Sequence, residues 1–200
     1  MIVYGASGHG KVIIEILESV GTPHIEVWDD AAKQPMWEYE VRKPLPVGEA
    51  KDHMVISIGV NATRKKVAER FAGADFGTAI HATAHISKRA IVGEGTVVMA
   101  NATVNADTRI GKHCIINTSA SIDHDCVIGD YAHISPNATL SGDVQVGEGT
   151  HMGSGASAIQ GVRIGKWCTI GAGTVVIRDI PDYATAVGNP ARIIKINEPV

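Results

Sequence analysis

A histidine set between two aspartates is the group in this sequence most suited to proton transfer. His124 lies in the segment SIDHDCVIG, with Asp123 and Asp125 on either side. An imidazole ionises near pH 6.5 and can take a proton from an amine or a hydroxyl that attacks an electrophile. A neighbouring carboxylate holds the ring in one orientation and stabilises the imidazolium that forms. A solvated surface histidine beside two acids is the simpler interpretation of the same three residues.

A glycine-rich turn near the N-terminus suggests a second kind of chemistry, the binding of an anion. The apolar residues 2–4 are followed by GASGHGK, which predicts a strand, a turn and the start of a helix. The glycine spacing does not match the GxGxxG of dinucleotide sites, but free N–H groups at a helix start favour anions. Asp29 and Asp30 follow the next predicted strand, where an acidic residue commonly accepts hydrogen bonds from ribose. A solvated turn is the alternative for this acidic pair.

The structure that must carry His124 follows from a six-residue repeat. In steps of six from Ile80 to Val176, seventeen consecutive positions are apolar, and the residue four places after each is small or medium-sized up to Thr174. This period fits neither a helix nor a plain strand, but it fits a parallel β-helix whose coils bury one continuous apolar column. Six glycines follow apolar residues of this column, where we expect tight turns of the backbone: Gly93, Gly111, Gly129, Gly147, Gly165 and Gly171.

Residues 1–77 have the pattern of a small α/β unit. We expect strands at 2–4, 24–28 and 55–58, a loop at 31–52, and helices at 11–20 and 61–72. Asn61 is the expected N-cap of the second helix. Strands that alternate with helices predict a βαβαβ domain with a parallel sheet.

These patterns divide the chain into three parts. The βαβαβ domain covers residues 1–77, the β-helix covers 78–187, and a C-terminal tail covers 188–200. The first part is expected to bind a small ligand at the carboxyl edge of its sheet.

The chain resembles the PglD/NeuD group of sugar acetyltransferases, within the hexapeptide-repeat acyltransferases. The resemblance runs along essentially the whole chain and rests on the repeat and on GASGHGK, VWDD, SIGVNATRKK and NTSASIDHDCVIG. It implies a left-handed β-helix with three hexapeptides per coil, an exception to the right-handed crossover rule, and between five and six coils over residues 80–180. It also implies that the first domain holds a nucleotide-linked sugar and that the β-helix holds acetyl-CoA.

The resemblance also implies roles for individual residues. His124 is the expected general base and Asp125 the residue that orients it. The expected acetyl-CoA contacts are His133, Gly142, Ser154 and Ala172. The expected contacts to the nucleotide sugar are Ser7, Gly8, His9, Asp29, Asp30, Gly59 and Ala62. No metal site is expected.

The spacing of three histidines bears on the assembly. His133 follows His124 by nine residues, half of an eighteen-residue coil, so the two lie on different faces of a triangular prism. One site that uses both therefore needs two adjacent chains, and we expect a homotrimer with active sites between subunits. His151 lies one coil beyond His133 and is expected to stack beside it.

The implied reaction is N-acetylation of the 4-amino group of a nucleotide-linked 4-amino-4,6-dideoxy sugar by acetyl-CoA. O-acetylation of sialic acid or a related sugar is the alternative within the same class. A non-enzymatic β-helix scaffold or a sugar-nucleotide sensor is the alternative from another class. The intact His124–Asp125 pair argues against the sensor.

The bulk composition narrows the remaining possibilities. The 200 residues are 44% hydrophobic and 20% charged, with a net charge of -3 and no basic cluster, which argues against nucleic acid or an anionic membrane as partner. No apolar run reaches the roughly 18 residues of a membrane span, and the N-terminus lacks the features of a signal peptide, so a cytoplasmic location is expected. Three cysteines at small positions of the repeat, without CxxC spacing, predict neither disulfides nor a zinc site.

Overall fold

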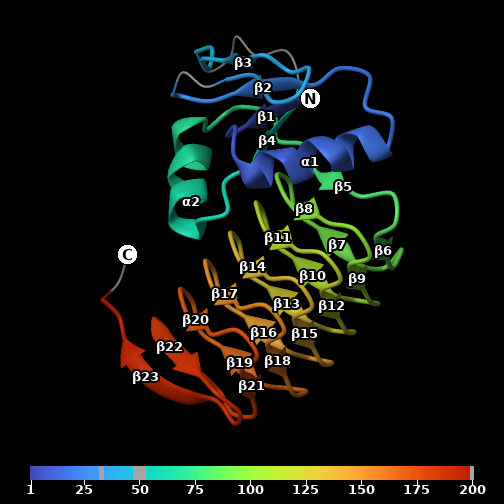
Figure 1. Ribbon diagram of the computed structural model, residues 1–200. Coiled ribbons are helices and arrows are strands. Elements are labelled where there is room, and N and C mark those ends of the chain that lie inside the picture. Colours follow the sequence, from blue (N-terminus) through green and yellow to red (C-terminus); the bar gives the residue numbers. More distant parts are fainter. Residues whose placement is uncertain (32–33, 47–52, 199–200) are drawn as a thin grey trace.

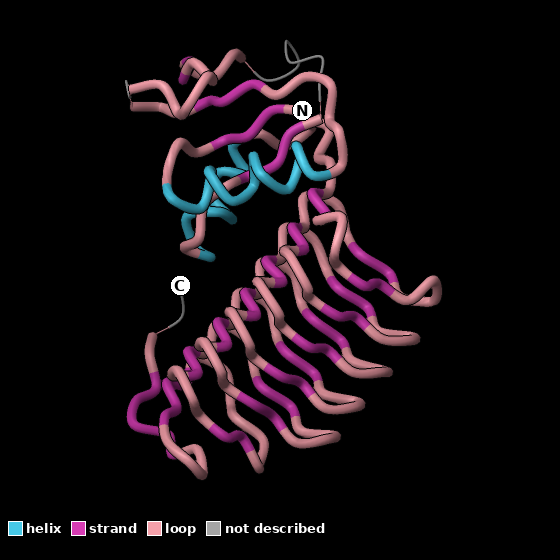
Figure 2. The backbone as a smooth tube through the Cα atoms, turned by 45° about the vertical axis from the view of Figure 1, so that its right-hand side comes forward, coloured by secondary structure: helices cyan, strands magenta, loops and turns pink. Residues whose placement is uncertain are grey.

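The computed structural model describes residues 1–31, 34–46 and 53–198, and it places a small α/β domain at one end of a long β-helix (Figure 1). Figure 2 shows the coils of the β-helix stacked one below another, with α1 between the sheet of the first domain and the first coils. No helix in the described part of the chain is long and apolar enough to cross a membrane.

The α/β domain is a parallel four-stranded sheet with a helix on each face. The strand order is β3-β2-β1-β4, with β1 at Ile2–Tyr4, β2 at Glu26–Trp28, β3 at Val41–Arg42 and β4 at Met54–Ile56. Helix α1, Gly8–Ser19, packs between this sheet and the β-helix, and helix α2, Asn61–Arg70, packs on the opposite face. Because both faces are covered, β1 and β4 are apolar throughout.

Three local expectations for this domain were wrong. The segment 31–52 is not all loop, because β3 adds to the sheet edge beside β2; residues 32–33 and 47–52 lie outside the described residues. Helix α1 begins at Gly8 rather than residue 11, since Gly10 lets the first turn approach the Gly5 carbonyl, which a Cβ would meet at 2.5 Å. Asn61 is not the N-cap of α2; Val60 is, and the Asn61 side chain donates to the Gly149 carbonyl of the β-helix at 3.0 Å.

The β-helix is a left-handed triangular prism whose two-residue strands form three parallel sheets; the repeat predicted the parallel β-helix, and the family resemblance implied its hand and its triangular coil. The covered face, which lies beneath the α/β domain, comprises β5 Ala79–Ile80, β8 Val97–Val98, β11 Ile115–Ile116, β14 His133–Ile134, β17 His151–Met152, β20 Thr169–Ile170, β22 Ala184–Val187 and β23 Arg192–Ile196. The small-residue face comprises β6 His85–Ile86, β9 Thr103–Val104, β12 Ser121–Ile122, β15 Thr139–Leu140, β18 Ser157–Ala158 and β21 Val175–Val176. The open face comprises β7 Ile91–Val92, β10 Arg109–Ile110, β13 Val127–Ile128, β16 Gln145–Val146 and β19 Arg163–Ile164.

The predicted apolar column fills the prism. Its members are buried from Val98 to Val176, and Ile80, Ile86 and Val92 pack against them at the first coil. Burying one such side chain stabilises the fold by roughly 1.5–3 kcal/mol, so the repeated column is the main source of prism stability. Within the segment assigned to the C-terminal tail, β23 pairs antiparallel with β22 and extends the covered face.

The tight turns begin at the six glycines, as expected, but these glycines are not the residues with left-handed backbone. Left-handed backbone occurs instead just before the small corner residue, as at Asn101 (φ 57), Asp125 (φ 60) and Asp143 (φ 57). Asn, Asp and Gly tolerate this conformation best, and it gives the turn its sharp corner. Glycines such as Gly129 serve coil stacking, because a Cβ there would lie 2.5 Å from the Glu148 nitrogen of the next coil.

Three columns of corners run along the prism, each named here by one residue. The His124 corner joins the small-residue face to the open face and includes Lys88, Ala106, His124, Gly142 and Gln160. The Tyr131 corner joins the open face to the covered face and includes His113, Tyr131, Gly149 and Trp167. The Ser154 corner joins the covered face to the small-residue face and includes Thr118, Pro136, Ser154 and Ala172.

His113 lies on the outside of its turn, where the α/β domain buries it to 4% exposure. Its ring stacks on Tyr131 and meets Phe76 edge-on, with ring centroids 5.3 and 4.6 Å away. Its Nδ1 has no hydrogen-bond partner among the described residues. Burial lowers the pKa of His113 to about 4, so the ring is neutral in the folded protein at neutral pH.

We predict that acid weakens the packing around His113. Because the folded pKa is lowered, the stabilisation is fully present above the unfolded value of about 6.5 and is lost as pH falls towards 4. One such group contributes at most about 1.4 kcal/mol per pH unit. Urea unfolding at pH 7.5, 6 and 5 should show a smaller loss in His113→Phe than in the wild type. The matched variant His85→Gln, at an exposed position, should keep the wild-type slope, and equal slopes in all three proteins would contradict the assignment.

Candidate active site

The imidazole of His124 is held by the residue that follows it. Nδ1 of His124 lies 2.8 Å from Oδ2 of Asp125, and the left-handed backbone at Asp125 turns this carboxylate towards the ring. With Asp125 ionised, Nδ1 carries the proton and Nε2 is left as the acceptor. The side chain of His124 is 60% exposed, so Nε2 is accessible to a substrate.

Acidic neighbours strengthen His124 as a base. The hydrogen bond to Asp125, and then the charges of Asp123, Asp125 and Asp143, raise the pKa of His124 above its ordinary value. Asp123 is fixed in its turn, because its Oδ1 accepts hydrogen bonds from Asn105 Nδ2 at 3.0 Å and from the His124 backbone N–H at 2.8 Å. These two bonds lower the pKa of Asp123 and keep it negative beside the imidazole.

A groove of about 620 Å³ lies against His124 on the side of the first coils. It is lined by His85, Ile86, Ser87, Lys88, Arg89, Asn105, Ala106, Asp123 and His124. Lys88 and Arg89 make no ion pair with any residue in the described part of the chain, and both are exposed. The groove therefore offers positive charge within about two coil rises, roughly 10 Å, of the candidate base.

Gly142 lies directly over the ring of His124, one coil further along the same corner. A Cβ at Gly142 would lie 2.6 Å from Cε1 and 2.8 Å from Nε2 of His124. The Asp143 backbone N–H also donates to the His124 carbonyl at 2.9 Å, which fixes the two coils in register. The expected acetyl-CoA contact at Gly142 and the expected base at His124 therefore adjoin each other within one chain.

Ser154 and Ala172 lie at the Ser154 corner, across the small-residue face from His124. Both are exposed, and Cβ atoms at the neighbouring Gly155 and Gly173 would meet nothing within 4 Å. This strip therefore has open space beside it. One chain does not bring this strip and His124 together, because a whole face of the prism separates them.

His133 is not at either of these corners; its strand lies on the covered face. Its ring stacks on that of His151 with centroids 4.9 Å apart, as the eighteen-residue spacing predicted, and it lies 3.0 Å from Asn117 Nδ2. His151 in turn bonds Ser135 Oγ at 2.8 Å. Burial, then the charges of His151 and Arg64, lower the pKa of His133 to about 3. Both rings are neutral at neutral pH and cannot substitute for His124 as an exposed base.

The expected nucleotide-sugar residues gather at the carboxyl edge of the α/β sheet. Ser7 and Gly8 are exposed at the start of α1, and His9 is largely buried, with its pKa lowered to about 4 by burial and by the charge of Arg64. Its Nε2 has no hydrogen-bond partner among the described residues. The free N–H groups of this helix start suit a phosphate.

The two aspartates after β2 have different environments. Asp29 accepts hydrogen bonds from the backbone N–H groups of Ala6 at 2.8 Å and Ala31 at 2.9 Å, so it shapes the glycine-rich turn itself. Asp30 accepts from the Tyr4 hydroxyl and pairs with Arg70 at 2.7 Å. These bonds lower the pKa of Asp30, with the Arg70 hydrogen bond as the main cause. Asp30 is the more exposed of the two and lies nearer to solvent.

A cavity of about 380 Å³ between α2 and the Tyr131 corner was not anticipated from the sequence. Two expected substrate residues, Gly59 and Ala62, line it together with Val60, Asn61, Gly149, His151, Trp167, Cys168, Thr169, Tyr183, Asn197 and Glu198. Trp167 and Tyr183 belong to coils more than a hundred residues from Ala62, so no local motif links them. The one sequence signal is that bulky rings replace the usual small or acidic residue at these corner positions.

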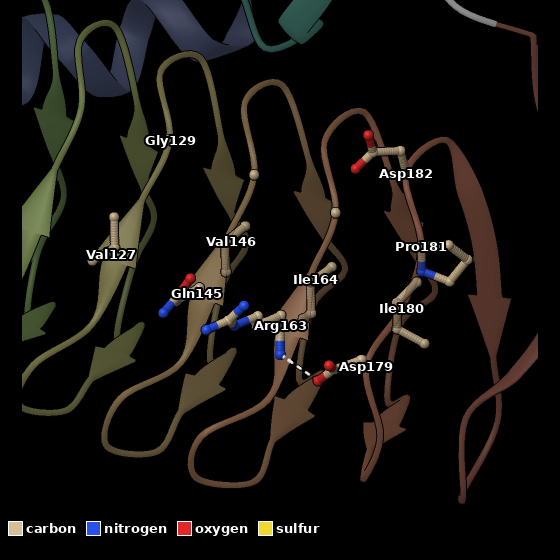
Figure 3. Close-up of a pocket in the computed structure, with 12 residues that line it drawn as sticks. Val127, Gly129, Gln145, Val146, Arg163, Ile164, Asp179, Ile180, Pro181 and Asp182 are labelled. Atoms are coloured by element: carbon tan, nitrogen blue, oxygen red, sulfur yellow. Dashed lines mark hydrogen bonds between the residues drawn. The ribbon is translucent and has the colours of Figure 1, made fainter.

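The open face carries a third depression, of about 670 Å³, shown in Figure 3. Gly129, Gly147 and Gly165 are among its lining residues, and the backbone N–H of Arg163, which also lines it, donates to Asp179 Oδ1 at 2.8 Å. None of the residues expected in the site lines it. Among the described residues, no three His, Cys, Asp or Glu side chains are grouped to hold a metal ion.

Comparison with protein families matches both parts of the chain. Residues 1–71 match the model described as PglD N-terminal domain, and residues 107–142 match the bacterial transferase hexapeptide model of six repeats. A curated relative, UDP-N-acetylbacillosamine N-acetyltransferase of Bacillus subtilis (strain 168), is 48% identical over 103 residues. That match covers 46% of this chain and 48% of the relative, so the chain matches about half the length of this protein.

Solved structures are similar along nearly the whole chain. The acetyltransferase domain of PglB from Neisseria gonorrhoeae FA1090 has a TM-score of 0.92 at 37% identity, covering 96% of this chain and 98% of that one. PerB from Caulobacter crescentus, solved in complex with CoA and GDP-perosamine, has a TM-score of 0.91 at 37% identity, covering 97% and 96%. WeeI from Acinetobacter baumannii AYE has a TM-score of 0.88 at 29% identity, covering 96% and 98%.

We predict that Gly142→Ala lowers turnover by displacing the ring of His124. The added methyl group would occupy the position of the ring, and a shift of about 1 Å in a catalytic group lowers the rate by roughly 10²-fold. Steady-state kinetics at saturating substrates should show the loss in kcat. The control is the same substitution in a His124→Ala background, where it should have little further effect because the ring is absent. Additive losses would show that Gly142 acts independently of His124.

Proposed function

Because the chain belongs to the PglD-like hexapeptide-repeat sugar acetyltransferases, we propose that it transfers the acetyl group of acetyl-CoA to the 4-amino group of a nucleotide-linked 4-amino-4,6-dideoxy sugar. The observation that carries this proposal is the exposed side chain of His124, which is hydrogen-bonded through Nδ1 to Asp125 and lines the adjoining groove. The sugar-nucleotide relatives favour an amine over a hydroxyl as acceptor, since two of them are named as N-acetyltransferases.

The chemistry of the proposed step follows from the charges around His124. A neutral amine that attacks a thioester carbonyl becomes positively charged and must lose a proton before the amide is stable. Nε2 of His124 accepts that proton, and Asp125 and Asp123 stabilise the resulting imidazolium. The thiol leaves with the electrons of the cleaved carbon–sulfur bond and regains a proton, which His124 can return.

The division of ligands follows from the two parts of the fold. The glycine-rich turn, with Ser7, Gly8 and His9, binds the diphosphate of the sugar nucleotide, and Asp30 accepts hydrogen bonds from the ribose. Gly142, Ser154 and Ala172 support acetyl-CoA along the two edges of the small-residue face. His133 contributes to the acetyl-CoA site from the covered face, beneath the α/β domain.

A complete site in this proposal requires two chains. The small-residue face presents Thr103, Ser121, Thr139, Ser157 and Val175, which are short enough for prisms to approach closely. If these faces surround a threefold axis, the His124 corner of one subunit meets the Ser154 corner of the next, and the contact closes after three copies. We propose a homotrimer on this geometry.

We predict that thiol release from acetyl-CoA depends on a 4-amino sugar nucleotide and on His124. A panel of UDP- and GDP-linked amino sugars should include an acceptor that gives stoichiometric thiol and N-acetylated product. His124→Ala should then lower kcat by roughly 10²–10⁴-fold, with little change in the KM for acetyl-CoA. No turnover with any amino sugar, or turnover only with hydroxyl acceptors, would contradict the N-acetyl assignment.

The pH profile provides the matched control for this prediction. Because the pKa of His124 is raised, kcat/KM should increase with pH through an inflection above the ordinary histidine value of 6.5. Asp125→Asn removes the main cause of the shift and should move the inflection downwards while lowering the rate. An unchanged inflection in Asp125→Asn would assign the titration to another group.

A further inference from the structure

Arg64 is the one Lys, Arg, Asp or Glu side chain that is fully buried within the described residues, at 1% exposure. It lies in the first turn of α2, at the boundary between the α/β domain and the β-helix. All three of its guanidinium nitrogens donate hydrogen bonds, to five different residues. None of these acceptors is a carboxylate, so the group is not buried as an ion pair.

On one side, Arg64 bonds the corners of successive coils. Its Nε donates to the His113 carbonyl at 2.7 Å and its Nη2 to the Tyr131 carbonyl at 2.7 Å. Asn61, one turn earlier in α2, donates to the carbonyl of Gly149 in the next coil at 3.0 Å. These three corner residues all have left-handed backbone, with φ of 52, 59 and 66.

Among the described residues, the corner carbonyls that accept hydrogen bonds from Arg64 and Asn61 accept none from the backbone of a neighbouring coil. Where the chain forms bonds between coils at this corner, the acceptor is the residue before the left-handed one, as in Tyr131 N–H to the Lys112 carbonyl at 2.8 Å. Burying the left-handed carbonyls under α2 without donors would leave polar groups unsatisfied. The first turn of α2 supplies those donors, and its position is thereby tied to the coil spacing.

On its other side, Arg64 holds the loop between β4 and α2. Nη1 donates to the Ile58 carbonyl at 2.8 Å and the Gly59 carbonyl at 3.2 Å, and Nη2 donates to Asn61 Oδ1 at 2.8 Å. This loop contains Gly59, leads into Ala62, and forms one wall of the 380 Å³ cavity. The guanidinium group of Arg64 thus donates hydrogen bonds both to this loop and to the β-helix.

The chemistry of the side chain explains why an arginine stands here. Burial lowers the pKa of Arg64 to about 10, so it remains charged at neutral pH. A buried charge without a counter-ion is a costly way to stabilise a fold. The rigid fork of five N–H donors can reach carbonyls in several directions at once, which an ammonium on a flexible stem cannot reproduce.

We propose that Arg64 is a positioning residue that sets the 58–61 loop against the β-helix and so fixes where the nucleotide sugar lies relative to acetyl-CoA. The inference rests on the proposed function, since the loop is taken as part of the sugar-nucleotide site. Arg64 itself touches neither substrate and acts through the backbone carbonyls that it holds.

The test compares Arg64→Lys with Lys65→Ala. Arg64→Lys keeps the charge but loses the fork, and it should raise the KM for the nucleotide sugar by about tenfold or more while leaving the KM for acetyl-CoA within about twofold. Lys65 lies next to Arg64 and also contacts the prism, through an ion pair with Glu148 at 2.7 Å, but it does not bond the loop. Lys65→Ala should therefore keep both KM values near wild type.

Two further measurements separate positioning from general stability. Millimolar guanidinium should partly restore nucleotide-sugar kcat/KM in Arg64→Ala, whereas equal sodium chloride should not. Hydrogen–deuterium exchange should rise at residues 57–63 in Arg64→Lys and stay unchanged in the coils beyond Gly149. Equal rises in both KM values, or an unchanged loop with wild-type KM, would overturn the inference. Failure of the proposed function would instead appear as an inactive wild type, and the exchange measurement would still decide the role of Arg64.

Discussion

Registration between coils is the constraint on which the rest of this structure depends. Neighbouring coils exchange backbone hydrogen bonds, as when the Asp143 N–H donates to the His124 carbonyl of the preceding coil at 2.9 Å, so equivalent corners recur every eighteen residues at a spacing of about 4.8 Å. That spacing places Gly142 over the His124 ring and stacks His133 on His151. It also presents the carbonyls of successive corners to α2, so the α/β domain takes its position from the same ladder.

The candidate site combines two environments that this registration keeps apart. At the His124 corner, exposure and carboxylates raise the pKa of an imidazole, which makes it a stronger base. On the covered face, burial and the charge of Arg64 lower the pKa of His133, which keeps that ring neutral. The proposed function thus gives proton transfer and ligand contact to histidines of opposite character, although both belong to the same six-residue repeat.

The sequence was informative where structure repeats or where partners are adjacent. The apolar column could be predicted because seventeen positions test one hypothesis, and the His124–Asp125 bond because the two residues are neighbours. The hydrogen bonds of Arg64 could not be predicted from the sequence, because their acceptors lie up to 67 residues away. Its one signal is a charged residue on the same helical face as the buried Val67, Ala68 and Phe71. The cavity beside Trp167 likewise depends on how two distant parts dock.

The central claim is that each active site combines the His124 corner of one subunit with the Ser154 corner of another. The direct measurement is the acetyltransferase activity of trimers reassembled from equal amounts of His124→Ala and Ala172→Trp chains, each inactive alone. Random mixing should pair an intact His124 corner with an intact Ser154 corner in about a quarter of the sites, so about a quarter of wild-type activity should return. Activity no greater than the sum of the two parents, in trimers shown to be mixed, would contradict a site shared between subunits.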